Sequence, residues 1–211
     1  MKNSLFILLL LTAATVYAQN AASQDYSLET LASWNNIEAK GDLNKDGIND
    51  WVMISHPPYK MKDEDGDEYS QPVLTICWGN GDGSFTIFRQ YRDVMPVSYG
   101  DDVVLEWTVD ITPRGVLNIG VSSFATAGSW ETWQETNVLR YQNGDFFLIG
   151  KEESSLMRNT GKKVDTSTNY LTGKRCTTTG NEFDRSVTPR SVWTRLPKGD
   201  LKKLGTWQLG Q

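Results

Sequence analysis

The residues whose spacing best suits a chemical role lie in one short loop in the first quarter of the chain. Oxygen-bearing side chains stand at the first, third, fifth and ninth positions of this loop, and glycine stands at the sixth. Ca²⁺ takes about six to eight oxygen ligands in irregular geometry, so a loop of this spacing can wrap the ion. Magnesium is less suited, because it keeps several waters in an octahedral shell. The predicted calcium ligands are Asp42, Asn44, Asp46, Asp50 and, through its backbone carbonyl, Ile48.

The loop is not an EF-hand, because Met53 stands where an EF-hand needs an acidic twelfth residue. Instead, the loop followed by the apolar run 51–54 resembles the calcium loop of FG-GAP and VCBS repeats. The later Gly-Asn-Gly-Asp-Gly turn at 79–83, before Phe85, resembles the second hallmark of the same repeat. The resemblance covers about residues 41–91, one repeat, and implies the same calcium ligands. Repeats of this family form β-propeller blades, but this chain contains no second copy of the loop.

Two other interpretations of acidic segments stand beside calcium binding. The loop 42–50 also fits an Asx-rich turn that holds no metal. A second acidic cluster, 63–68, has glycine at its fourth position and Gln71 at its ninth, which is the wrong pattern for the same loop. We interpret it as a solvated loop, with a weak or shared cation site as the alternative.

Neither the nucleophile motif of a serine hydrolase nor a phosphate-binding loop is present in the sequence. His56 is the one histidine, no Gly-x-Ser-x-Gly motif occurs, and the glycines at 79–83 precede no helix that would bind phosphate. Two carboxylates brought together by the fold would suit glycoside hydrolysis. The candidates for such a pair, which no specific signal supports, are Glu106, Asp110, Glu131 and Glu135.

Tryptophan is frequent, with eight residues, and two of them flank polar residues in one segment. If 128–134 is a strand, Trp130 and Trp133 point to opposite faces, so at least one of them can be exposed. Exposed aromatic rings beside Gln, Glu and Arg stack on sugars or anchor a protein partner. The alternative is one tryptophan in the core and the other at its rim.

The N-terminal segment predicts export. Lys2 precedes an apolar run from Leu5 to Leu11, and small residues precede a cleavage point after Ala18. Residues 1–18 are therefore interpreted as a signal peptide, and the run is too short for a permanent membrane anchor. In an oxidising compartment the two cysteines, Cys77 and Cys176, are expected to form a disulfide, with two separate buried thiols as the alternative.

Composition and turn chemistry predict one antiparallel all-β domain over 19–211. The 211 residues include 21 basic and 26 acidic side chains, a mild negative charge that argues against a nucleic-acid binder. Short β-rich segments alternate with turn residues, among them Asn143-Gly144, a strong hairpin signal. A short helix is expected at 27–34 and a helical turn at 201–204, with long loops at 159–166 and 178–189. Strands are expected at 51–54, 73–78, 85–91, 103–110, 116–121, 136–141 and 146–150 and, more weakly, at 169–178 and 191–196.

The expected architecture is a partial propeller or an open, twisted antiparallel sheet. The expected function is a non-catalytic binding or interaction module, periplasmic or extracellular, that is stabilised by structural calcium and binds a protein or a glycan. A secreted glycan hydrolase with paired carboxylates and a periplasmic enzyme inhibitor are the alternatives. We expect neither nucleic-acid binding nor a membrane anchor.

Overall fold

The computed structural model describes residues 25–99, 103–197 and 199–210. The chain divides into two units, Met1–Ser33 and Trp34–Gln211, and each is described by itself. The predicted signal peptide, 1–18, lies outside the described residues. In the first unit, helix α2 (Leu28–Ala32) confirms the expected short helix, and the hydroxyl of its N-cap Ser27 accepts a hydrogen bond from the backbone N–H of Thr30 at 3.2 Å.

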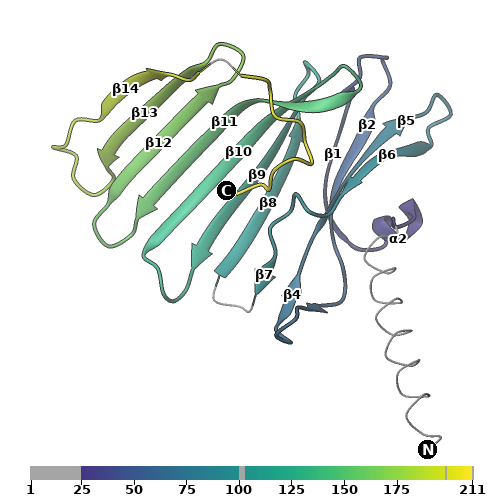
Figure 1. Ribbon diagram of the computed structural model, residues 1–211, viewed down its shortest axis with the longest axis horizontal. Helices are drawn as coiled ribbons and strands as arrows, with labels where there is room; N and C mark the ends of the chain where they lie inside the picture. Colours follow the sequence, from purple (N-terminus) through teal and green to yellow (C-terminus); the bar gives the residue numbers. More distant parts are fainter. Residues whose placement is uncertain (1–24, 100–102, 198, 211) are drawn as a thin grey trace, which may run out of the picture. The chain divides into compact units, whose positions relative to one another are not determined.

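The second unit contains all the described strands, which form three antiparallel sheets (Figure 1). In chain order they are β1 (Asn35–Gly41), β2 (Asp50–His56), β3 (Met61–Lys62), β4 (Glu68–Ser70), β5 (Val73–Gly79), β6 (Phe85–Tyr91), β7 (Ser98–Tyr99), β8 (Val103–Ile111), β9 (Val116–Ala125), β10 (Glu131–Gln142), β11 (Asp145–Met157), β12 (Lys162–Asn169), β13 (Lys174–Asn181) and β14 (Arg190–Arg195). The sheet orders are β1-β2-β5-β6, β3-β4-β7 and, for the largest, β14-β13-β12-β11-β10-β9-β8. The predicted antiparallel all-β fold is confirmed, and its sheets are open rather than closed into a barrel.

The main core lies between the four-stranded sheet and one face of the seven-stranded sheet. One buried cluster contains Val52, Ile54 and Ile76 of the four-stranded sheet together with Ile119 and Leu139 of the seven-stranded sheet. Strands β2 and β5 are buried over most of their length because they are the two central strands of their sheet. Their nearly continuous apolar sequences, which allowed both to be predicted, are typical of such strands.

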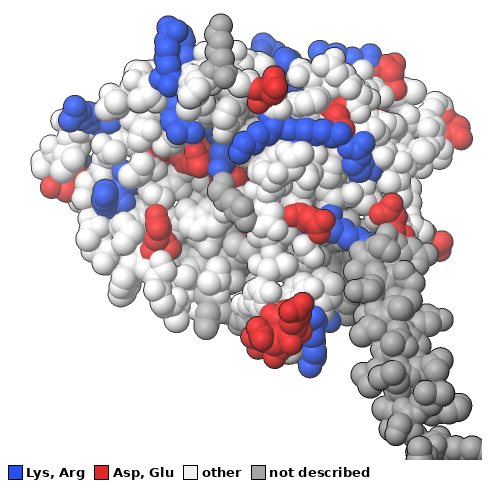
Figure 2. Space-filling model, in the orientation of Figure 1, with Lys and Arg blue, Asp and Glu red and all other residues white. Residues whose placement is uncertain are grey.

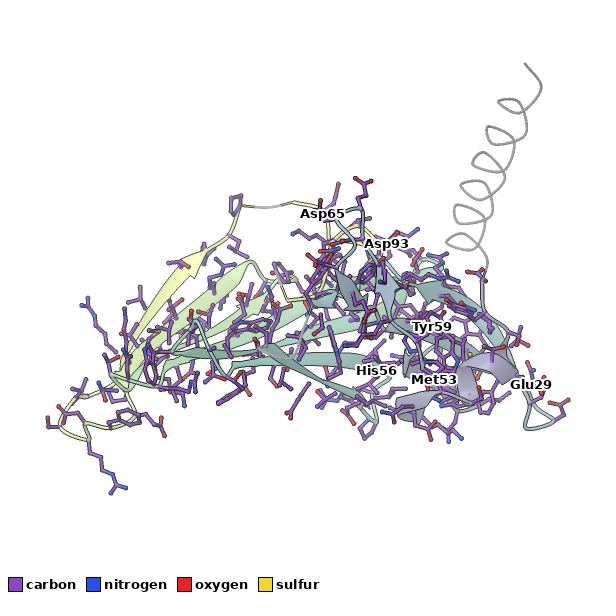
Figure 3. All side chains as sticks on the ribbon, turned by 90° about the horizontal axis from the view of Figure 1, so that it is seen from below. Glu29, Met53, His56, Tyr59, Asp65 and Asp93 are labelled. Carbon is purple, nitrogen blue, oxygen red and sulfur yellow. The ribbon has the colours of Figure 1, made fainter. Side chains whose placement is uncertain are left out.

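The seven-stranded sheet therefore has two different faces. We call the face that packs on the core the covered face, and the opposite one the open face. Residues alternate between the faces along each strand, so Ile119 lies on the covered face and Ser122 on the open face. The β12–β14 part extends beyond the core and is a single layer with side chains on both sides when the sheet is seen edge-on (Figure 3).

Short turns hold consecutive strands in register. Asn143 and Gly144 have positive φ angles of 51° and 80° and join β10 to β11, which confirms the predicted hairpin. The glycine-rich turn between β5 and β6 closes with a hydrogen bond from the N–H of Asn80 to the carbonyl of Ser84 at 2.8 Å. Both hairpins were predicted from local turn chemistry, which does not depend on the rest of the fold.

The C-terminal segment crosses the covered face as an irregular strap (Figure 1). The helical turn expected at 201–204 is wrong: this part pairs with β11, because the N–H of Leu148 donates to Lys202 and the N–H of Leu204 donates to Phe146. Leu204 and Leu209 are buried in the main core. Apolar residues three positions apart suit a helix, but here the free backbone groups beside β11 outweigh that local pattern.

In the C-terminal third, β14 confirms the strand expected at 191–196, and β13 extends to Asn181, into the loop expected at 178–189. Two other expectations there are wrong. The region 159–166, expected to be a loop, contains the start of β12, and the strand expected at 169–178 is interrupted by a turn before Lys174. Gly173 has a φ angle of +64°, which allows this turn. The strands here are rich in Ser, Thr and Lys because neither face is covered by a core, so they lack the apolar alternation that reveals half-buried strands.

Candidate functional site

The predicted calcium loop connects β1 to β2 and is closed by its own side chains. The carboxylate of Asp42 accepts hydrogen bonds from the backbone N–H groups of Lys45 at 2.6 Å, Asp46 at 3.2 Å and Gly47 at 3.0 Å. Gly47 has a φ angle of +87°, consistent with the sharp turn expected there. The side-chain amide of Asn44 donates to the carboxylate of Asp46 at 2.9 Å. Three of the predicted ligand side chains therefore surround one turn at the surface.

Asp50, the fourth predicted side-chain ligand, is fully buried and joins two segments. One carboxylate oxygen accepts from the backbone N–H of Leu43 at 2.8 Å and the other from that of Gly79 at 3.1 Å. Burial raises the pKa of Asp50, although these hydrogen bonds oppose the rise. Gly79 is required here, because a Cβ atom would lie 2.2 Å from the carbonyl oxygen of Asn49. Asp50 thus links the acidic loop to the glycine-rich turn that follows β5.

The arrangement of the acidic loop separates its carboxylates. Asp42 and Asp46 face the surface side of the turn, whereas Asp50 turns its two oxygens to backbone N–H groups in the interior. In the part of the chain that the structure describes, no three His, Cys, Asp or Glu side chains are gathered as metal ligands are. The donor set of three carboxylates, one amide and one carbonyl still has the chemistry that calcium prefers.

The second acidic cluster forms the exposed hairpin between β3 and β4. Asp63 closes the turn by accepting from the backbone N–H groups of Asp65 at 3.1 Å and Asp67 at 2.9 Å. Figure 2 shows a dense acidic group over this hairpin, and Asp65 lies at the surface in Figure 3. The side chains are solvated, as the pattern of the cluster suggested.

The disulfide expected between Cys77 and Cys176 is wrong in this structure, in which both are free thiols. Cys77 is buried in β5 of the four-stranded sheet, and Cys176 lies half-buried in β13 of the seven-stranded sheet. Burial raises the pKa of Cys77 to about 12, so this thiol is inert. The expectation failed because compartment and cysteine count say nothing about which sheets the two strands join.

The four carboxylates weighed for glycoside hydrolysis do not converge. Glu106 and Asp110 lie on the open face of β8, Glu131 begins β10, and Glu135 lies on the covered face. Two of them are thus on the opposite side of the sheet from Glu135. The register of these strands, which decides this, depends on pairing between distant segments.

Glu135 instead belongs to a buried ion cluster on β10 and β11. Lys151 Nζ lies 2.8 Å from a carboxylate oxygen of Glu135 and 3.1 Å from one of Glu153, which is opposite Glu135 in register. The Glu135 side chain is 6 % exposed and also accepts from the backbone N–H of Gly210 at 3.0 Å. Burial opposes the charged form of Lys151, but both carboxylates outweigh it and raise its pKa. The Glu135 carboxylate thus binds Lys151 on one side and the backbone of the C-terminal strap on the other.

His56 lines a hollow of about 300 Å³. Its side chain is half-buried at the end of β2 (Figure 3) and makes no hydrogen bond to a described residue. Burial lowers its pKa, because the charged imidazolium is less well solvated there.

The open face of the seven-stranded sheet presents rows of polar side chains. Neighbouring strands place residues of the same row directly opposite one another, about 4.8 Å apart. One row, which we call the polar ladder, crosses all seven strands and consists of Glu106, Ser122, Gln134, Ser154, Asp165, Thr178 and Ser191. All seven are exposed or half-buried. Two hydrogen bonds order the ladder, from Ser154 to Asp165 at 2.6 Å and between Thr178 and Ser191 at 2.8 Å.

A groove follows part of this ladder. Its volume is about 530 Å³, and its lining includes Glu106, Ser122 and Gln134 of the ladder together with the apolar side chains of Phe124 and Leu156. A second hollow of about 290 Å³ continues along the ladder, sharing Gln134 and Ser154 with the first. The open face is therefore hollowed along a line of hydroxyl, amide and carboxylate groups, with apolar surface at one end.

Arg158 organises the apolar end of the groove. Its guanidinium carbon lies 4.2 Å from the ring centre of Phe124 and 5.9 Å from that of Trp130, and one nitrogen donates to the carbonyl of Ala125. Trp130 is 61 % exposed, while Trp133 lies half-buried on the covered face against the core. The structure therefore does not bring the two candidate tryptophans to one surface. Phe124 is the aromatic side chain of the open face that lines the groove, and Trp130 lies across the Arg158 guanidinium from it.

Comparisons with known protein families, curated proteins and solved structures find no match to this chain. Among the described residues there is no helix with the length and apolar character needed to cross a bilayer. Phe124 and Arg158, which are 34 residues apart, were not predicted as site residues. An aromatic residue among small ones in 121–126 was the one signal that marked Phe124, and nothing local marked Arg158.

Proposed function

We propose that the protein is a non-catalytic binding module that holds an extended glycan along the open face of the seven-stranded sheet. The observation that carries the proposal is the polar ladder with its adjoining groove. Hydroxyl and amide side chains donate and accept hydrogen bonds equally, which suits the hydroxyl groups of a sugar. Their repeat of about 4.8 Å is close to the length of one sugar ring in an extended chain.

The aromatic end of the groove supports the same ligand class. Phe124 is 44 % exposed, and Arg158 keeps its ring in place. Aromatic rings offer apolar area at little entropic cost, and sugars present C–H groups on their ring faces for such contact. One stacked ring at the end of the ladder would fix the position of the chain, while the ladder would bind its hydroxyl groups.

The two carboxylates of the polar ladder are too far apart for hydrolysis. Retaining glycosidases hold two carboxyl groups about 5 Å apart and inverting ones about 6.5–9.5 Å apart, on either side of the bond that breaks. On the ladder, Glu106 lies on β8 and Asp165 on β12, four strands apart, or about 19 Å at the usual strand spacing. Two carboxylates at that separation cannot act on one glycosidic bond.

Affinity electrophoresis against a panel of neutral polysaccharides tests this proposal. We expect at least one of cellulose ether, xylan, mannan, β-1,3-glucan and starch to retard the protein. The double variant Phe124→Ala/Gln134→Ala should lose the retardation, and Thr179→Ala, on the covered face of β13, should keep it. Retardation by none of the panel, or equal retardation of the double variant, contradicts the proposal. Release of reducing ends from a retarding polysaccharide would instead favour the hydrolase.

We also infer that the loop 42–50 binds structural calcium. Asp42, Asn44, Asp46, Asp50 and the Ile48 carbonyl would hold the ion, and its positive charge would offset the repulsion among three carboxylates. The turn supports this inference because Asp42, Asn44 and Asp46 already surround it. Binding by Asp50 requires its oxygens to use their second lone pairs, since each already accepts one backbone N–H.

Thermal unfolding with calcium and with chelator tests the calcium site. A ligand that binds only the folded protein adds about 2.7 kcal/mol to the free energy of unfolding at a hundredfold excess over its Kd. Asp46→Ala should lose most of that gain, and Asp65→Ala in the β3–β4 hairpin should retain it. An identical Tm of the wild type under both conditions would mean that the loop is only a turn. Export through the segment 1–18 completes the proposal and is tested by N-terminal sequencing of the mature protein.

A further inference from the structure

The outer edge of β14 is the most exposed part of the seven-stranded sheet. Among the described residues β14 pairs on one side only, with β13, and it forms the end of the sheet in Figure 1. All six residues from Arg190 to Arg195 are exposed. Trp193 is 68 % exposed on the open face, and Val192 is 46 % exposed on the other. Natural edge strands are usually protected against pairing with another chain by charged residues or proline. The centre of β14, 191–194, contains neither.

The backbone groups along this edge are available for pairing. The N–H of Leu196 donates to the carbonyl of Gly173, so position 196 faces β13. In an antiparallel pair every second residue faces the partner, and therefore Thr194 and Val192 also face β13. The N–H and C=O groups of Ser191, Trp193 and Arg195 point away from the sheet, in the positions that an added strand would use.

The side chains beside the edge are basic. Arg190 and Arg195 end the strand, and Lys174 is opposite Arg195 in register. Lys174, Trp193, Thr194 and Arg195 line a hollow of about 390 Å³. Residues 158–211 contain eleven of the 21 basic side chains and four of the 26 acidic ones, although the whole chain is negative. The charge at this edge thus opposes that of the remaining protein.

We propose that β14 binds an extended acidic peptide segment of a partner protein, which adds to the sheet as an eighth, antiparallel strand. Backbone hydrogen bonds supply part of the affinity in this kind of recognition, and side chains supply the specificity. Residues of the segment opposite Arg190 and Arg195 are acidic, and those opposite Val192 and Trp193 are apolar. A second copy of this chain is the less suitable occupant, because antiparallel self-pairing brings two basic edges together.

Fluorescence anisotropy with a labelled peptide tests the proposal directly. The probe is the blocked hexapeptide Glu-Thr-Val-Val-Thr-Glu, and its counterpart has Lys in place of both Glu residues. We expect the acidic peptide to bind at least tenfold more tightly than the basic one. The variant Arg190→Glu/Arg195→Glu should reverse this preference, and Trp193→Ala should weaken both peptides. Because β14 is exposed, these variants should unfold at the wild-type urea concentration.

N-methylated peptides separate strand addition from simple charge attraction. Methylation at the third and fifth residues removes the N–H groups opposite Trp193 and Ser191, and should weaken binding at least tenfold. Methylation at the second and fourth residues, whose N–H groups point away, should change it less than threefold. Equal effects of the two patterns would overturn the proposal in favour of electrostatic binding. A dimer in sedimentation equilibrium that Trp193→Asp dissociates would overturn it in favour of self-association.

Discussion

Replacing Asp50 by alanine should destabilise the protein more than any other single change in the acidic loop. The substitution removes the acceptor of two buried N–H groups, those of Leu43 and Gly79. A buried donor without a partner costs about 1–3 kcal/mol. Some of this loss is offset, because the substitution also removes a carboxylate whose burial is unfavourable and raises its pKa. We therefore expect the free energy of unfolding to fall by about 2–5 kcal/mol.

Urea unfolding in the presence of chelator measures this effect without any contribution from calcium. With a slope of about 2 kcal/mol per molar urea, the midpoint should fall by about 1–2.5 M. Asp50→Asn keeps one acceptor oxygen and should lose about half as much. Asp46→Ala is the matched control, since the Asp46 side chain is exposed and its hydrogen bonds are local. A midpoint for Asp50→Ala equal to that of Asp46→Ala would refute the view that Asp50 anchors the loop to the glycine-rich turn.

Three further predictions concern buried groups. Without reductant, a thiol reagent should modify Cys176 in the folded protein and a second thiol, Cys77, only after unfolding; a single thiol per chain or none would contradict the free cysteines. The pKa of His56 is lowered by burial, so the unfolded state binds more protons than the folded state near and below about pH 6.5. The free energy of unfolding should therefore fall as the pH drops through this range. His56→Gln should reduce the fall in urea midpoint between pH 7.5 and 5. Lys151→Met leaves the buried carboxylate of Glu135 unpaired and should cost about 3–5 kcal/mol in urea unfolding, whereas Lys62→Met, in an exposed pair, should cost less than about 1 kcal/mol.

Most of the strands that could be predicted either are buried on both faces or have surroundings that differ between their two faces; β14, which is exposed on both, was expected only as a weaker strand at 191–196. The alternation of Val103–Ile111 and the apolar run of β5 indicate burial directly, and the Asn143-Gly144 turn follows from its preference for positive φ angles. Strand β12 was not predicted, because most of its residues are half-buried or buried and its sequence has no apolar alternation. The C-terminal strap was mistaken for a helical turn because its pairing partner, β11, lies more than fifty residues earlier.

The candidate site also has one part that the sequence predicts and another that it does not. The loop that contains Asp42 and Asp46 is contiguous, so its ligand chemistry can be read from the order of residues. The polar ladder has no signature in the chain, since its seven members come from seven strands with ordinary polar sequences. The contact between the Arg158 guanidinium and the Phe124 ring joins residues that are 34 positions apart in the sequence. Surfaces built from one residue per strand become visible only when the register of every pair is known.

The sequence by itself determined the antiparallel class, the two hairpin turns and the acidic loop. All three depend on interactions between near neighbours: alternation along a strand, positive φ angles at glycine and asparagine, and the spacing of oxygen atoms in a turn. The tertiary structure alone decided that Asp50 holds two segments together, that Cys77 and Cys176 lie in different sheets, and that β14 is a free basic edge. These features depend on strand order, and strand order is set by the burial of surfaces contributed by distant parts of the chain.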